Sequence, residues 1–322
     1  MKKIMINRNT AEMGAHKEKY FELLKKDFKK YKTLYLLFLL PLAWYIVFCY
    51  IPMYGLLMSF EDYNIRLGIL KSDWIGFENF RRFFSDPYFG RYILNTIRIS
   101  VWAIAINFPI PIIFALLINE ISNKYFVKTI QTITYMPHFI SLVVICGIVQ
   151  TFVSPEGVII RIMTMLTGQN IETSLLNNPR LFAPIFVLSG TWQNTGFASI
   201  IYVAALTGVD KSLIEAAEID GAGHFKRLLN VTIPAIMPTI VVMFILRLGS
   251  ALSADYEKVL LLINQLNAEK AEVLSYYIYK RGIVESSYGI STAAGLFNSV
   301  INVIFVVSAN RISRKVSETS LW

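Results

Sequence analysis

The stretch EAAEIDGAGHFKRLLNVTIP, Glu215–Pro234, is polar and lies between two long apolar runs. Hydrophobic residues make up 55% of the 322 residues and charged residues only 16%, against about 25% charged in an average soluble domain. This composition indicates an integral membrane protein. A polar stretch between two apolar runs is then a loop at one face of the membrane, and the side on which it lies sets the topology of the whole chain.

Six apolar runs are long enough to cross a hydrocarbon core of about 30 Å, which takes roughly 20 helical residues. Trp192–Gly196 interrupts the fourth run, and Arg247 lies in the fifth. Polar groups at membrane depth are costly, so we expect both to face a protein interior or a water-filled path. The sequence therefore predicts an all-α integral membrane fold with six transmembrane helices, at Leu34–Phe60, Ile93–Ile118, Ile130–Val153, Leu181–Leu206, Ala235–Leu252 and Gly289–Asn310.

Lysine and arginine are in excess before the first run, in the loops 119–129 and 207–234, and after Asn310. Cytoplasmic segments near membrane spans carry such an excess, so the N-terminus, the C-terminus and the stretch Glu215–Pro234 are predicted to be cytoplasmic. Most of the formal net charge of +9 is then a signal of orientation. We therefore expect contacts with membrane lipid and none with nucleic acid.

The basic N-terminal segment carries apolar residues at helical spacing among its lysines. Such a pattern suits an amphipathic helix in the inner headgroup region, and a solvated basic tail that only fixes topology is the alternative. The apolar residues of this pattern are Tyr20, Leu24, Phe28 and Tyr31. The expected division of the chain is a cytoplasmic segment 1–32, a six-helix domain 33–310 that includes the loop 208–234, and a cytoplasmic tail 311–322.

We expect the quoted stretch and the residues before it to fold as two short helices joined by a turn. Asp210 is a candidate N-cap for a helix over Lys211–Ile219, because its carboxylate can accept hydrogen bonds from free backbone N–H groups. Gly221-Ala222-Gly223 breaks that helix, since glycine adopts the left-handed conformations of tight turns. A second helical piece over His224–Asn230 leads to Pro234, which suits the first turn of the next span.

The first of these two helices has the features of a docking element. Ala216 and Ala217 carry almost no bulk, so another protein can approach closely, and Glu215 and Glu218 place charge beside them. A short helix with such a face suits a groove on a cytoplasmic partner. Composition alone leaves open the alternative of a surface loop without a partner.

The spacing of the stretch resembles the coupling-loop motif of binding-protein-dependent ABC importer permeases. The matching residues are Glu215-Ala216-Ala217, Gly221, Val231, Ile233 and Pro234. Valine and isoleucine stand at 231 and 233 where the family usually has isoleucine and leucine, and both are aliphatic exchanges. Three further runs, TWQNTGFASIIYVAALTGVD (191–210), YYIYKRGI (276–283) and STAAGLFNSVINVIF (291–305), resemble the polysaccharide or complex-oligosaccharide permeases, as does the terminal Ser320-Leu321-Trp322.

The resemblance implies a maltose-permease-like fold of the type I ABC importers in a bacterial plasma membrane. It implies four partners: a second permease in a heterodimer, a cytoplasmic ABC ATPase dimer, an extracytoplasmic sugar-binding protein and an oligosaccharide substrate. No cofactor is expected in this chain, because it lacks a GxxxxGK[ST] phosphate loop, so ATP and Mg²⁺ belong to the ATPase. The residues expected to couple it to the ATPase are Glu215, Ala216, Ala217, Asp220, Gly221, Ala222, Gly223 and Pro234.

Polar and aromatic residues at or near membrane depth are candidates for the path of the sugar. Oligosaccharides are held by aromatic faces and by amide and charged groups. Arg247 has the alternative of pairing with a carboxylate of the second permease, Trp192 that of anchoring an interface, and Asp255 with Tyr256 that of forming an outer gate. The candidates are Trp192, Gln193, Asn194, Arg247, Asp255, Tyr256 and Asn298.

Two other functions stay open from the residues alone. Permeases for non-sugar solutes share the Glu-Ala-Ala and Gly spacing, so the loop does not exclude them. A membrane-embedded enzyme needs titratable groups gathered at one site. The three histidines, His16, His138 and His224, have no paired carboxylates or metal-ligand spacing beside them, so no catalytic or metal-binding residue is predicted and the chain is not expected to be an enzyme.

Overall fold

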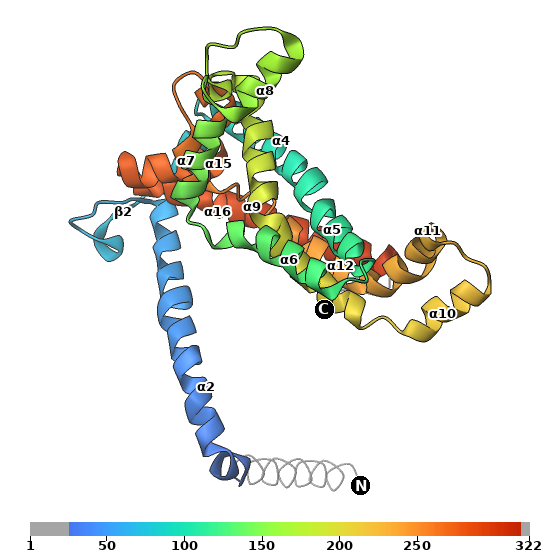
Figure 1. The fold of residues 1–322 in the computed structure, drawn as a ribbon. Helices are drawn as coiled ribbons and strands as arrows, with labels where there is room; N and C mark the ends of the chain where they lie inside the picture. The colour runs from blue at the N-terminus through green and yellow to red at the C-terminus, as the bar shows by residue number, and fades with distance from the viewer. Residues whose placement is uncertain (1–25, 317–322) are drawn as a thin grey trace, which may run out of the picture. The chain divides into compact units, whose positions relative to one another are not determined.

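A computed structural model describes residues 26–316 of the chain and the side chains of residues 26–314 (Figure 1). These residues are helical apart from loops and one short hairpin. They form two compact units, divided between Leu57 and Met58. Tyr20 and Leu24 of the expected amphipathic helix lie outside the described residues.

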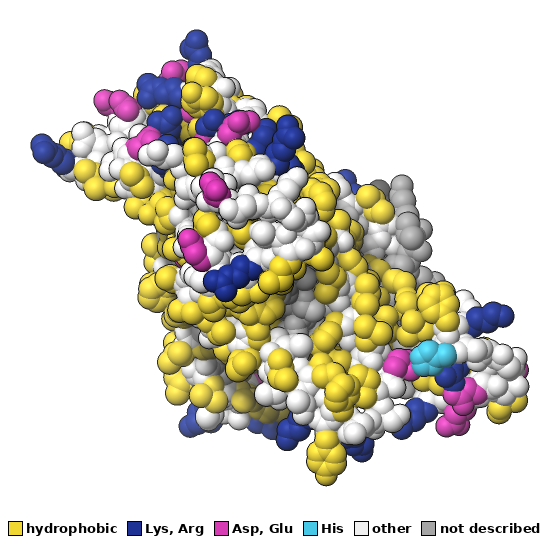
Figure 2. All heavy atoms as spheres, turned by 45° about the horizontal axis from the view of Figure 1, so that its top comes forward, with side chains coloured by type: hydrophobic (Ala, Val, Ile, Leu, Met, Phe, Trp, Pro, Cys, Tyr) yellow, Lys and Arg dark blue, Asp and Glu magenta, His cyan; other side chains and the backbone are white. Residues whose placement is uncertain are grey.

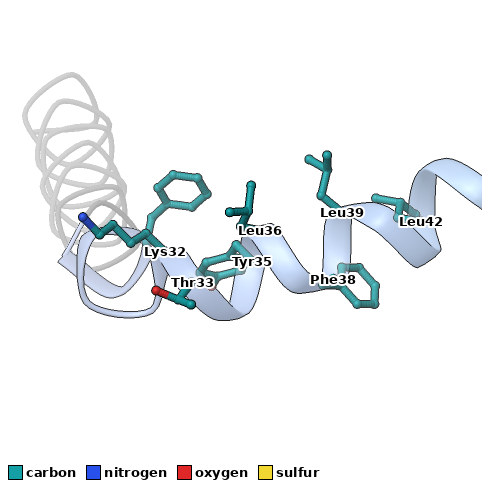
Figure 3. A pocket seen from close by; sticks show the side chains of 8 residues that line it. Lys32, Thr33, Tyr35, Leu36, Phe38, Leu39 and Leu42 are labelled. Carbon is teal, nitrogen blue, oxygen red and sulfur yellow. The ribbon is translucent and has the colours of Figure 1, made fainter.

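The first unit is a single long helical rod. It consists of α2 (Lys32–Tyr45), a π-helical turn η1 (Ile46–Tyr50) and most of the 3₁₀ helix η2 (Ile51–Phe60). The departures from α-helix come just before Pro52, which cannot donate a backbone hydrogen bond. Its apolar side chains are exposed on all sides, as expected of a helix whose neighbours are lipid or another protein. Figure 3 shows the side chains that border a shallow hollow along α2: Phe28, Lys32, Thr33, Tyr35, Leu36, Phe38, Leu39 and Leu42.

The second unit begins with a joint that holds three segments of the chain together. Strands β1 (Glu61–Asp62) and β2 (Asp73–Trp74) pair antiparallel, with Glu61 opposite Trp74. The buried Asn79 amide donates to the carbonyls of Met58, Ser59 and Glu61, at 3.4, 3.2 and 2.8 Å. A Cβ at Gly289 would meet the same amide, so the start of the last long helix closes the joint. We call this set of contacts the Asn79 joint.

Long apolar helices make up most of the second unit. Four helical stretches in the described part of the chain are long and apolar enough to cross a membrane, and there are up to six if each of two bent pairs is one span. The four are Lys32–Phe60, Phe89–Asn119, His224–Leu248 and Tyr288–Arg314. The long elements of this unit are α4 (Phe89–Asn107), α5 (Pro109–Asn119), α6 (Lys124–Tyr135), α7 (Leu142–Phe152), α9 (Pro179–Thr207), α12 (Ile233–Leu248) and α16 (Tyr288–Val316).

Shorter elements connect these helices. On the face drawn in Figure 2, hydrophobic side chains are exposed over much of the surface, as expected where a protein meets lipid or another protein. The short elements are η3 (Ile69–Lys71), α3 (Glu78–Phe84), η4 (Met136–Phe139), α8 (Val158–Thr167), η5 (Leu175–Asn177), α10 (Lys211–Ile219), α11 (His224–Arg227), η6 (Leu228–Thr232), α13 (Tyr256–Leu262), α14 (Ala268–Ala271), α15 (Leu274–Tyr279) and η7 (Lys280–Val284).

The structure differs from the sequence prediction in the third and fifth runs. The third run is not one helix, because α6 with η4 and α7 meet at 103° around Ser141, whose hydroxyl caps α7. The helix of the fifth run begins at His224, ten residues before Pro234, and ends at Leu248, four residues before the predicted end. The π-helical η6 precedes Pro234 and accommodates its ring and its missing N–H without ending the helix.

Three apolar clusters hold the second unit together. The largest joins α4, α7, α9 and α13 around Ile99, Val149, Phe182 and Val259. A second surrounds the buried Phe83 ring with Tyr92, Leu274 and Tyr277, and a third packs α5, α9 and α12 around Ala115, Tyr202 and Ile236. The largest cluster and the chain around it position the polar cavity described below.

Candidate functional site

Helices α10 and α11 form an arm that leads away from the long helices (Figure 1). Asp210 begins it as predicted, because its Oδ1 accepts from the backbone N–H of Ser212 at 2.9 Å. That hydrogen bond stabilises the charged carboxylate and holds the pKa of Asp210 below its ordinary value. Helix α10 covers Lys211–Ile219, which matches the predicted bounds.

The turn of the arm depends on one glycine. Gly221 has φ = +77°, a conformation that glycine adopts without strain, and its N–H donates to the Glu218 carbonyl at 3.0 Å. The N–H of Ala222 donates to the Ala217 carbonyl at 2.9 Å, so both bonds of a Schellman helix end are present. Gly223 has φ = −64° and is the N-cap of α11. Within the predicted break over residues 221–223, only position 221 therefore has a backbone conformation that requires glycine.

The arm presents apolar side chains that no described residue covers. Leu213, Ile219 and Phe225 are 53%, 87% and 69% exposed. Glu215 and Ala216 are exposed as well, and Ala217 is half-buried. Exposed apolar side chains on a short polar arm mark a candidate docking surface for another protein. The candidate coupling residues 215–217 and 220–223 therefore lie together, whereas Pro234 lies within the continuous helix that follows.

Two side-chain contacts brace the arm, and the sequence analysis missed both. Arg227 of α11 pairs with Glu218 of α10. His224 Nε2 lies 3.2 Å from Oε2 of Glu120, which caps the end of α5. The second pair connects the arm to a helix about a hundred residues earlier in the chain, so it has no local sequence signal.

A polar cavity of about 220 Å³ lies among α4, α9, α12 and α13. It brings together four of the seven residues predicted for the sugar path: Gln193, Asn194, Arg247 and Asp255. Asn194 is held in place from the break in the third run, since Nδ1 of His138 lies 3.0 Å from its Oδ1. Asp255 Oδ1 caps α13 by accepting from the backbone N–H groups of residues 257 and 258, at 3.1 and 3.3 Å.

Lys258 lines the same cavity and was not predicted. Its side chain is buried, its Nζ donates to the Phe186 carbonyl at 2.8 Å, and the same Nζ lies 4.7 Å from the centre of the Phe186 ring. A Cβ on Gly190 would lie 3.2 Å from this Nζ, so the glycine leaves room for the ammonium. The available sequence signal was a lysine directly before the apolar run VLLL (259–262).

The other three path candidates lie elsewhere. Trp192 lines a separate apolar hollow with Phe152 and Leu188. The Tyr256 ring stacks on Tyr279, with centroids 5.1 Å apart. Asn298 Oδ1 is buried without a hydrogen-bond partner among the described residues.

No group of three or more His, Cys, Asp or Glu side chains that could hold a metal ion is present in residues 26–314. Two features of this part of the chain could bind another molecule: the arm formed by α10 and α11, and the polar cavity.

A family model for the inner membrane component of binding-protein-dependent transport systems matches residues 107–318, a range that contains the arm and most of the cavity. The chain belongs to this family. It is a multi-pass protein of the bacterial plasma membrane and a permease subunit, not an enzyme, since ATP hydrolysis in these transporters belongs to a separate subunit. The family predicted from the spacing of Glu215–Pro234 is confirmed.

Relatives narrow the family further. The chain is 40% identical to protein LplB of Bacillus subtilis over 93% of this chain and 92% of that protein. It is 38% identical to the polygalacturonan/rhamnogalacturonan transport system permease YteP of the same organism, over 95% of each. A chain of a bacterial ABC transporter that imports the acidic polysaccharide alginate has a TM-score of 0.83 and 38% identity, and covers 91% of this chain and 99% of its own.

A second structure of the alginate transporter matches as well. It contains a periplasmic protein with a bound alginate pentasaccharide, and the likeness covers 92% of this chain and 99% of that one. The helical permease fold that we predicted is therefore shared with a transporter that works with a binding protein.

Proposed function

We propose that this chain is one permease of a two-permease ABC importer for oligosaccharides. The polygalacturonan/rhamnogalacturonan permease YteP and the alginate importer both match over nearly the whole chain, and this supports a carbohydrate over other solutes. The observation that carries the proposal is the arm α10–α11, with its exposed apolar side chains and its Gly221 turn.

The proposed topology has six spans and both termini in the cytoplasm. In it the bent pair of α6–η4 and α7 is one span and α9 is another, while α10 lies outside the membrane after a 71° bend. The excess of lysine and arginine on the side of the arm supports this orientation.

The arm is the proposed connection to the ATPase dimer, which binds the ATP and Mg²⁺. Helix α10 lies in a groove of the ATPase, where Leu213 and Ile219 become buried and Glu215 meets polar or basic groups at the rim. Ala216 and Ala217 allow the close approach. The Gly221 turn sets the angle at which closure of the ATPase moves the spans. The contacts of Glu218 with Arg227 and of His224 with Glu120 make the arm stiff.

The second permease and the binding protein complete the proposed assembly. The exposed apolar sides of α2 suit contact with lipid or with the second permease. The cavity near Arg247 is the part of the sugar path that this chain supplies, and an extracytoplasmic binding protein delivers the sugar to it.

Cysteine crosslinking tests the arm. In a variant with Cys49 and Cys146 replaced by serine, Ile219→Cys should crosslink to a cysteine at the rim of the ATPase groove. Leu70→Cys is the matched control, since this side chain is 86% exposed and lies far along the chain from the arm. Crosslinking of Leu70→Cys but not of Ile219→Cys would place the ATPase on the opposite face and refute the proposal.

Uptake by a deletion strain tests the substrate class. Restoring the gene should restore uptake of an oligosaccharide. If it restored uptake of a non-sugar solute alone, the carbohydrate assignment would be wrong, although the permease assignment would stand.

A further inference from the structure

Two cations face the polar cavity without a carboxylate partner. Arg247 and Lys258 both line it, and neither lies within ion-pair distance of an acidic group in residues 26–314. Asp255 is the one acidic residue that lines the cavity in the described chain, and its Oδ1 already accepts two backbone N–H groups of α13. The described lining therefore carries an excess of one positive charge.

The hydrogen-bonding capacity of Lys258 is only partly used. An ammonium group has three donors, and the described residues give Nζ one acceptor, the Phe186 carbonyl. Burying a charge that is incompletely paired is costly, so such groups are rare unless a ligand or partner meets them. The position of Nζ beside Gly190, on the wall of the cavity, allows an anion inside the cavity to reach it.

The cavity has no free aromatic platform of the kind that holds neutral sugars. Phe186 is the one aromatic residue among those that line it, and the Lys258 ammonium lies over the ring. Trp192 and Tyr256, which would supply such faces, lie elsewhere or stack on another ring. What the cavity offers instead is two cations and the amides of Asn107, Gln193 and Asn194.

We infer that this cavity selects oligosaccharides that carry carboxylate groups, with Arg247 and Lys258 as the specificity-determining residues. The Arg247 guanidinium at the end of α12 can take a carboxylate by two parallel hydrogen bonds, and the buried Lys258 ammonium adds a point charge from α13. The amides bind the sugar hydroxyls. The inference rests on the proposed function, since it names the chemistry of the sugar that this permease transports.

The test uses the complete importer, with both permeases, the ATPase and the binding protein, in proteoliposomes. The probes are trisaccharides of galacturonate and of mannuronate, and their neutral counterparts made by carboxyl reduction. Arg247→Gln and Lys258→Gln should each lower uptake of the acidic trisaccharide by about tenfold, the effect of one lost charge-assisted hydrogen bond. Arg247→Lys keeps the charge but not the two parallel hydrogen bonds, so it should lose less uptake than Arg247→Gln.

Two further readouts separate selectivity from folding. The amount of assembled importer in the proteoliposomes should be the same for both glutamine variants as for the unaltered importer, so a lower uptake is not a loss of folding. Arg98→Gln is the matched control, because it removes a positive charge from α4 that does not line the cavity. Its uptake of the acidic trisaccharide should equal that of the unaltered importer.

The outcomes are distinct. Equal uptake of the acidic trisaccharides by the unaltered importer and by Lys258→Gln and Arg247→Gln would overturn the inference, as would uptake of neutral trisaccharides alone. Either result would leave the proposed carbohydrate importer standing. If the unaltered importer carried no trisaccharide of either kind but carried another solute, the proposed function itself would fail.

Discussion

The left-handed turn at Gly221 offers a test in which backbone strain is separated from steric contact. A Cβ built on Gly221 has no atom within 4 Å, so a larger side chain meets open space. The φ of +77° is nonetheless unfavourable for residues with a Cβ, by about 1–2 kcal/mol, and β-branched residues lie at the upper end. Gly221→Val should therefore shift the equilibrium between this turn and other turn geometries by roughly 5- to 30-fold, toward the others.

Uptake of the transported sugar by a deletion strain that expresses each variant measures the effect. Gly221→Val should lower uptake by about that factor, Gly221→Ala by less, and Gly221→Asn least, because asparagine tolerates the left-handed region. The amount of protein in the membrane should be the same for all three, since the turn is exposed. Stimulation of ATP hydrolysis by the loaded binding protein should fall in the same order.

Two results would contradict this reasoning. Uptake by Gly221→Val equal to that of the unaltered chain would mean that the turn angle does not limit coupling. A loss in Gly221→Asn as large as in Gly221→Val, at equal amounts in the membrane, would mean that the size of the side chain matters and not the backbone conformation.

Two further predictions concern packing and capping. A Cβ at the buried Gly196 would overlap the Thr134 carbonyl, so Gly196→Val should destabilise the purified protein by about 1–3 kcal/mol. Gly147 is the control, because a Cβ at this open position of α7 meets no other atom, and Gly147→Ala should raise the melting temperature slightly. Asp210→Ala should speed amide hydrogen exchange in α10 and Asp210→Asn should not, since an amide oxygen also caps helices. The pKa of Asp210 lies below its ordinary value of 3.8, so its stabilisation of α10 is complete above that pH and is lost as the pH falls through the lowered value. Protection of α10 against exchange in the unaltered chain, relative to the intrinsic rate at each pH, should therefore be lost only in acid. Loss of this protection already near neutral pH would exclude protonation of the carboxylate as its cause.

Local features of the fold were predictable from the sequence. The Asp210 cap, the bounds of α10 and the Gly221 turn depend on residues within a dozen positions of one another, and propensity and capping rules describe such segments well. The break in the third run at Ser141 also had a local signal, because Pro137 precedes a serine that caps the next helix. That signal was outweighed by the apolar character of the run.

Features that depend on packing between distant segments were not predictable. Lys258 lines the cavity because α13 packs on α9, which brings its ammonium to a carbonyl 72 residues earlier. Tyr256, two residues before it, points to Tyr279 instead. Polarity near membrane depth therefore identified the region of the cavity but not which of two neighbouring side chains faces it.

The Asn79 joint has a consequence for the order in which the protein is made. The carbonyls of Met58, Ser59 and Glu61 leave the ribosome before the amide that satisfies them, and Gly289 follows more than two hundred residues later. The joint is complete only after the last long helix has been inserted, because the start of that helix at Gly289 packs against the Asn79 amide.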